Sequence, residues 1–139
     1  MNIQRYTPLR RTGWGGKTRN KFFAKPVHLD NGQSFDSTTE YRRYTALETY
    51  QRIGVISGLT LHPKIVLVAK RGKAPEIAFR PDYSYTEKGR TVYEDSKARP
   101  MTARDSLIFK LWAHYGPSLL RITGAKGETK REIMPGVDV

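Results

Sequence analysis

The chain has 139 residues, which suits one domain with a modest hydrophobic core and requires no disulfide or metal to hold it together. Its 25 Lys and Arg against 13 Asp and Glu give a formal net charge of +12, which favours a polyanionic partner, most commonly nucleic acid. The absence of cysteine excludes a disulfide framework and a thiolate metal site, and no apolar run approaches the ~20 residues of a membrane span.

Residues 1–26 are rich in Arg, Lys and Gly, with aromatic residues interleaved and no clear periodicity. This pattern predicts a flexible basic arm whose cations contact phosphates and whose rings stack on bases. A tail that never touches DNA is the alternative. The residues of the arm expected to bind nucleic acid are Arg10, Arg11, Lys17, Arg19 and Lys21.

A helix is predicted from about Thr38 to Ile53, because Ser37 followed by Glu40 is the capping-box pattern and Gly54 follows the helical run. Glu40 has two interpretations that need not exclude each other. It can belong to the N-terminal cap, or it can be a carboxylate of a metal or active site.

Three strands are expected next, at Lys64–Ala69, Ile77–Tyr85 and Arg90–Lys97. Pro81 lies inside the second and removes a hydrogen-bond donor, so that strand should be bent, bulged or at an edge. Glu87-Lys88-Gly89 predicts a hairpin turn between the second and third strands.

The remaining elements are a helix over Thr102–Tyr115 and a final strand over Leu119–Thr123. The residues expected to face inward from the helix are Leu107, Ile108, Leu111, Trp112 and Tyr115. The order of elements predicts an α/β fold in residues 27–123, with a mixed β-sheet flanked by helices. Residues 124–139 are expected to form a loose polar tail.

Charged residues gather on the second and third expected strands. Because strand side chains alternate between faces, Asp95 and Lys97 share one face, and Glu94 lies on the other. A hairpin would place Asp82 beside Asp95, and two buried carboxylates make sense if a divalent cation lies between them. Such a cation activates water for phosphodiester hydrolysis, and Lys97 would offset the developing charge. The alternatives are an ordinary surface salt bridge between Asp82 and Lys97 and a solvated Asp95.

Pro81-Asp82 followed by Asp95-Ser96-Lys97 resembles the PD-(D/E)xK signature of restriction-endonuclease-like nucleases. With the run Phe35 to Glu40 added, the chain is similar, over roughly residues 21–122, to a family of small, largely uncharacterised phage proteins assigned to that superfamily. The resemblance implies a restriction-endonuclease-like mixed sheet flanked by helices.

The resemblance also implies site roles. Asp82 and Asp95 would bind Mg²⁺ or Mn²⁺, with Glu40 as a further ligand, and Lys97 would be the catalytic lysine. Lys110 would face phosphate; a solvated helix face is its alternative. A bulge at Asp95 would exchange its role with that of Glu94.

The expected function is therefore a Mg²⁺-dependent DNA endonuclease. By analogy within the superfamily, it would cut branched or Holliday-junction DNA in phage replication or recombination, in the cytoplasm of the bacterial host and as a homodimer. A non-catalytic nucleic-acid-binding protein and an RNase are the alternatives. The histidines show no metal-ligand spacing and are expected to be ordinary surface or core residues: His28, His62 and His114.

Overall fold

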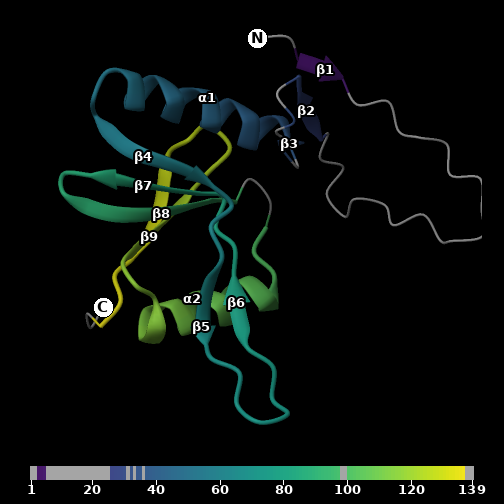
Figure 1. Ribbon diagram of the computed structural model, residues 1–139, viewed down its shortest axis with the longest axis vertical. Coiled ribbons are helices and arrows are strands. Elements are labelled where there is room, and N and C mark those ends of the chain that lie inside the picture. Colours follow the sequence, from purple (N-terminus) through teal and green to yellow (C-terminus); the bar gives the residue numbers. More distant parts are fainter. Residues whose placement is uncertain are drawn as a thin grey trace, which may run out of the picture.

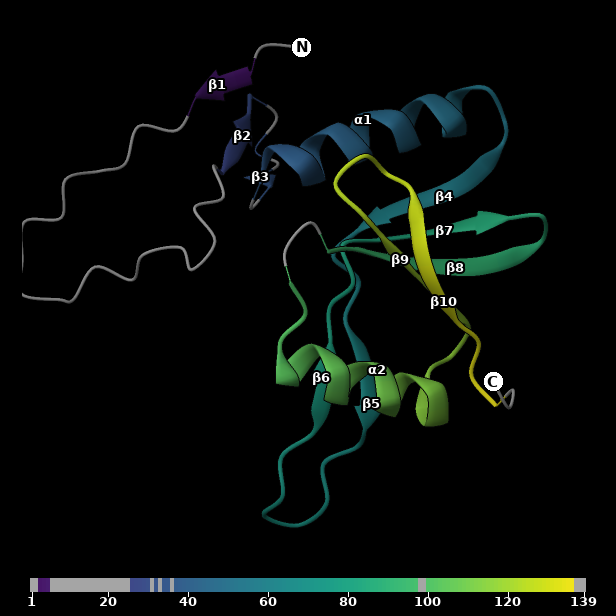
Figure 2. The same cartoon turned by 180° about the vertical axis from the view of Figure 1, so that it is seen from behind.

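In the computed structural model, a mixed five-stranded sheet lies between two helices (Figure 1). The strand order is β10-β9-β8-β7-β4; β8 and β9 are parallel and the other neighbours antiparallel. The strands are β4 (Ile56–Leu61), β7 (Tyr83–Glu87), β8 (Arg90–Ser96), β9 (Leu119–Thr123) and β10 (Thr129–Ile133). Helix α1 (Thr38–Arg52) covers one face and α2 (Ala103–Tyr115) the other, as Figure 2 shows from behind. The expected α/β class is confirmed.

The structure describes residues 3–5, 26–30, 32, 34–35, 37–97 and 100–136. Two smaller sheets accompany the main one. The first has the order β1-β2-β3, and the second is an antiparallel ribbon of β5 and β6. Their strands are β1 (Ile3–Arg5), β2 (Val27–Leu29), β3 (Ser34–Phe35), β5 (Ile65–Val68) and β6 (Ile77–Phe79). Among the described residues, no helix has both the length and the apolar character needed to cross a membrane.

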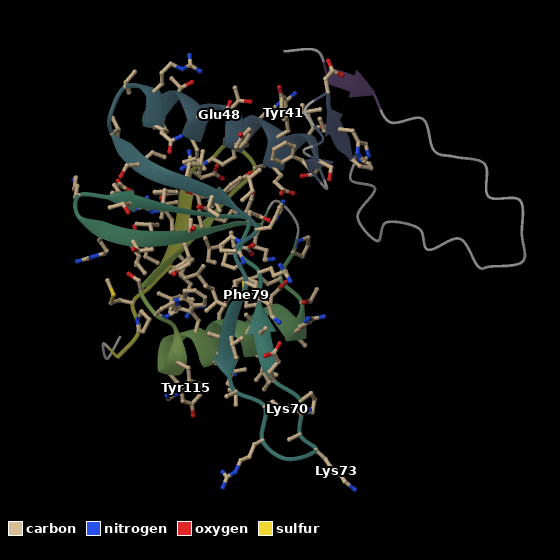
Figure 3. The ribbon with its side chains drawn as sticks, in the orientation of Figure 1. Tyr41, Glu48, Lys70, Lys73, Phe79 and Tyr115 are labelled. Carbon is tan, nitrogen blue, oxygen red and sulfur yellow. The ribbon has the colours of Figure 1, made fainter. Side chains whose placement is uncertain are left out.

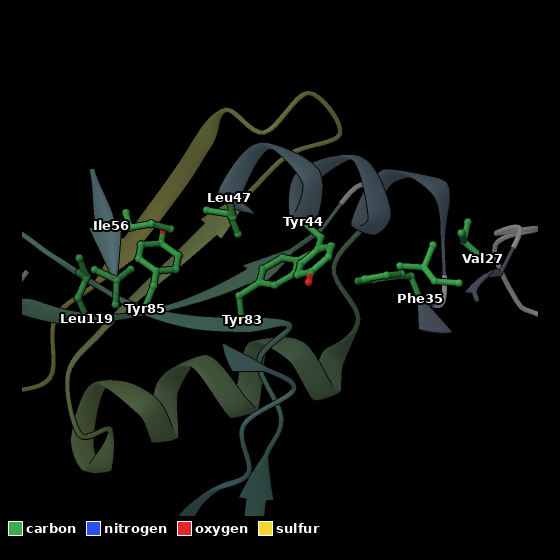
Figure 4. Close-up of a cluster of buried hydrophobic side chains, with 10 residues drawn as sticks. Val27, Phe35, Tyr44, Leu47, Ile56, Tyr83, Tyr85 and Leu119 are labelled. Atoms are coloured by element: carbon green, nitrogen blue, oxygen red, sulfur yellow. The ribbon is translucent and has the colours of Figure 1, made fainter. Parts of the chain in front are cut away.

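The strand alternation divides the hydrophobic core in two. On β9, Leu119 packs in the cluster beneath α1 and Leu120 in the cluster on α2. The α1 cluster is built around Tyr44, Leu47 and the β7 tyrosines (Figure 4). Because both faces are covered, polar side chains on the central strand are buried on either side.

Several expected elements are confirmed closely: both helices, the third and final strands, and the turn at Lys88-Gly89, across which Glu87 pairs with Arg90. The second expected strand is wrong as one continuous element. It breaks at Arg80–Asp82 into β6, which pairs with β5, and β7, which joins the main sheet. Pro81 cannot donate to a ladder, and the break lies where the chain leaves one sheet for another.

Other expectations are corrected at the ends of the chain and on α2. Residues after Gly124 are not uniformly loose, because β10 pairs with β9 as an edge strand, and Ile3–Arg5 of the expected flexible arm pairs with β2. On α2, Leu107 and Tyr115 are exposed, at 57% and 60%. The buried residues of α2 are Asp105, Ile108, Phe109 and Trp112. The inward face is therefore rotated toward the side that carries Asp105 and Phe109.

The two faces of α2 predict different mutational costs. Trp112→Ala should lower the free energy of unfolding by about 3–5 kcal/mol, because this fully buried ring contacts Phe79 and Tyr93. Leu107→Ala, on the exposed face, should change it by no more than about 0.5 kcal/mol. Urea denaturation of both variants checks this, and equal losses would contradict the helix orientation.

Candidate functional site

Three strands of the main sheet bring polar residues to the same end. Leu61 of β4 pairs with Tyr83 of β7, and Tyr83 pairs with Glu94 of β8. The next residue at this end of each strand is polar: His62, Asp82 and Asp95. The site is therefore built where β4 and β8 approach their ends and β7 begins.

Glu40, His62 and Asp82 form a cluster in which one potential ligand atom from each lies within 4.8 Å of the others. His62 Nε2 lies 3.3 Å from Glu40 Oε1, and the His62 amide donates to the Asp82 carbonyl at 2.9 Å. The Tyr83 hydroxyl donates to the carbonyl of Glu40 and fixes this part of α1 against β7. Two carboxylates and an imidazole are a donor set that fits a divalent cation.

The carboxyl groups of Asp82 and Asp95 lie close enough together to influence each other's charge. Burial, the Asp95 charge and the Glu40 charge raise the pKa of Asp82 well above its ordinary value. Burial also raises the pKa of Asp95, although Lys97 opposes this. The Ser96 amide donates to Asp82 Oδ2 at 2.7 Å and orients it. Without a cation, the state in which Asp82, Asp95 and Glu40 are all ionised is therefore unfavourable.

Lys97 lies beside the carboxylates, with its side chain 11% exposed. Its Nζ is 2.7 Å from Asp95 Oδ2 and 3.4 Å from Asp105 Oδ1. Asp105 also closes the capping box of α2, because its Oδ2 accepts from the Thr102 amide at 2.9 Å. The ammonium is thus held from β8 and from the first turn of α2.

Glu94 lies on the opposite face of β8, fully buried beneath α1. Arg43 donates to it twice, from Nε at 2.7 Å and from Nη2 at 2.8 Å, and the Tyr85 hydroxyl donates at 2.7 Å. β8 keeps regular register with β7 up to Glu94 and with β9 up to Ser96, so no bulge exchanges the two acids. Glu94 belongs to the core and Asp95 to the site.

The structure brings together four residues that the sequence placed at a site: Glu40, Asp82, Asp95 and Lys97. Ser37 caps α1 by accepting from the Glu40 amide, so the cap and the site share this residue. The alternative of an ion pair between Asp82 and Lys97 is not what forms, since Lys97 pairs with Asp95 and Asp105. Lys110 is exposed on α2. Arg10, Arg11, Lys17, Arg19 and Lys21 lie outside the described residues.

His62 and Asp105 were not foreseen. The sequence pattern does not predict β4, the strand before His62, because Gly58, at φ +65°, interrupts its alternation where its pairing with β7 shifts register. His62 itself has φ +48°, a left-handed conformation that turns the chain out of β4. Asp105 had a local signal, because Thr102 and Asp105 have the spacing of a capping box.

Asp82→Asn should raise the melting temperature of the protein in chelator at neutral pH. A carboxyl whose folded-state pKa is raised stabilises the fold below its unfolded-state pKa and loses that contribution as pH rises through the folded-state pKa. The gain should therefore vanish at acidic pH. The control, Glu94→Gln, should destabilise at neutral pH because Arg43 loses its buried partner. A lower melting temperature for Asp82→Asn at neutral pH would contradict the electrostatic description.

A family model described as "Protein of unknown function (DUF1064)" matches residues 19–116, which include all of the site residues described above. No curated protein matches the chain significantly. Because the match covers well over half of the sequence, the chain belongs to the DUF1064 family.

Proposed function

We propose that the protein is a metal-dependent DNA endonuclease that hydrolyses phosphodiester bonds at the Glu40–Asp82–Asp95–Lys97 site. The observation that carries the proposal is the close approach of the Asp82 and Asp95 carboxyl groups beside a third carboxylate and a lysine. Desolvated like charges are costly unless something binds them, and such arrangements concentrate at functional sites. The net charge of +12 supports a polyanionic substrate.

Glu40, His62 and Asp82 would hold a divalent cation, and Asp95 adjoins them through Asp82. When bound, the cation supplies an activated water and a polarised phosphodiester. The ligand set suits Mg²⁺ or Mn²⁺ through its carboxylates, while the imidazole of His62 extends it toward first-row transition ions.

Lys97 would act on the phosphate. Asp95 and Asp105 hold its ammonium in place, so that it donates toward a phosphate oxygen as negative charge develops there. Asp95 orients the ammonium by pairing with it, and Asp105, which belongs to the capping box of α2, contacts it as well. Both effects prepare the ammonium before substrate arrives.

Cleavage is tested on linear duplex, single-stranded, flap and four-way-junction DNA with Mg²⁺, Mn²⁺ or chelator. Wild type should cut only with metal, and a preference for the junction would support a role on branched DNA. Lys97→Gln should lower the rate by about 10²-fold or more. The matched control, Lys88→Gln at the β7–β8 turn, should cut like wild type.

Binding of all DNA substrates without cutting, with any metal, would replace this proposal with a non-catalytic DNA-binding protein. Preferential cutting of matched RNA strands would instead identify an RNase.

Metal binding is measured separately, by calorimetry and by melting temperature. At about 100 times the dissociation constant, a bound ion should stabilise the fold by about 2.7 kcal/mol. His62→Ala should weaken Mn²⁺ and Co²⁺ binding more than Mg²⁺ binding, because Mg²⁺ prefers oxygen ligands. His114→Ala, an exposed histidine on α2, is the control. Equal affinities in wild type and His62→Ala would remove His62 from the ligand set.

A further inference from the structure

The ribbon formed by β5, β6 and their connecting loop, residues 64–80, leaves the sheet at the site and projects past α2 (Figures 1 and 2). Ile65 pairs with Phe79 near its base. At its tip, the Arg71 amide donates to the Ala74 carbonyl at 3.0 Å, and the Ala74 amide donates back to the Arg71 carbonyl at 2.9 Å. This β5–β6 hairpin is therefore a structured element to its end.

Only the part of the β5–β6 hairpin nearest the main sheet packs on the rest of the protein. Leu67 is buried in the α2 cluster, and the ring of Phe79 meets Phe109 and Trp112 edge-on, with centroids 6.4 and 6.1 Å apart. Residues 69–77 are all exposed. The base is anchored by these aromatic contacts, and the tip extends into solvent.

The tip carries concentrated positive charge. Its cations are Lys70, Arg71 and Lys73, and Figure 3 shows Lys70 and Lys73 at the far end of the hairpin. Glu76, the one acid of the loop, lies 2.6 Å from Lys64. Within the described part of the chain, no carboxylate lies within ion-pair distance of the three tip cations. Their charge is available to an external anion.

The candidate metal centre lies at the base of the β5–β6 hairpin. His62 precedes β5, Asp82 follows β6, and the hydrogen bond between their backbones joins the two ends. Gly72 lies ten positions after His62, so at about 3.3 Å per residue the tip can reach roughly 30 Å from the site. That is close to one turn of B-DNA, about 34 Å.

We propose that the β5–β6 hairpin binds the double-stranded DNA flank of the substrate, with Lys70, Arg71 and Lys73 on its phosphates. A two-stranded ribbon fits the major groove of B-DNA, whereas the deep and narrow major groove of A-form RNA does not admit it. The substrate would then carry up to about one turn of duplex beside the scissile bond. The position of that bond rests on the proposed function; the DNA contact does not require cleavage.

The test is fluorescence anisotropy in chelator, with a DNA duplex of about 30 base pairs, roughly 100 Å long, and the corresponding single strand. Arg71→Gln/Lys73→Gln should weaken duplex binding at least about tenfold and flatten the slope of log K against log[salt] by about 1.8, or 0.9 for each lost phosphate contact. The matched control, Lys88→Gln/Arg90→Gln, removes the same charge from the β7–β8 hairpin at the other end of the sheet. It should leave the duplex affinity and the salt slope close to those of wild type.

Equal duplex affinities for the two double variants would overturn the inference, and so would equal losses on duplex and single strand. Melting temperatures matching wild type show that neither variant has lost its fold. Cleavage is scored independently. If DNA binding depends on the hairpin but no DNA is cut, only the nuclease proposal is contradicted. If DNA is cut but the hairpin substitutions leave binding unchanged, only this inference is contradicted.

Discussion

The buried ion pair between Arg43 and Glu94 is the constraint on which the rest of the molecule depends. It joins α1 to the central strand β8, and Tyr85 completes the coordination of the carboxylate. Because strand side chains alternate, holding Glu94 under α1 directs Asp95 to the face of α2. A slip of one residue would exchange the two acids, leaving Arg43 without its partner and the site without its carboxylate.

Two neighbouring acids thus have opposite environments. Glu94 is fully buried and accepts three hydrogen bonds from fixed donors. Asp95 is almost as buried but adjoins Asp82, so burial raises the pKa of both aspartates. The first arrangement stabilises the fold, whereas the second retains unfavourable electrostatic energy that a bound cation would relieve. This contrast separates a structural carboxylate from the proposed functional ones.

The site and the β5–β6 hairpin have a common structural origin. β4 continues toward β5 through His62, and β6 continues toward β7 through Pro81 and Asp82. The chain therefore leaves the main sheet after β4 and returns to it at β7 at the same level, where the His62 amide donates to the Asp82 carbonyl. The left-handed conformation of His62 bends the chain out of β4 here, and Glu40 of α1 lies beside both His62 and Asp82. One deformation thereby creates the candidate metal centre and the basic projection beside it.

The sequence by itself determined features that depend on neighbours along the chain: the helix capped at Ser37, the turn at Lys88-Gly89, and Asp95 and Lys97 on one strand face. Capping, turn chemistry and strand alternation are local, so residues a few positions apart specify them. Only the tertiary structure decided that His62 joins Glu40, that Arg43 neutralises Glu94, and which face of α2 is buried. Arg43 and Glu94 are 51 positions apart. Such contacts follow from packing and strand order, which local periodicity does not encode.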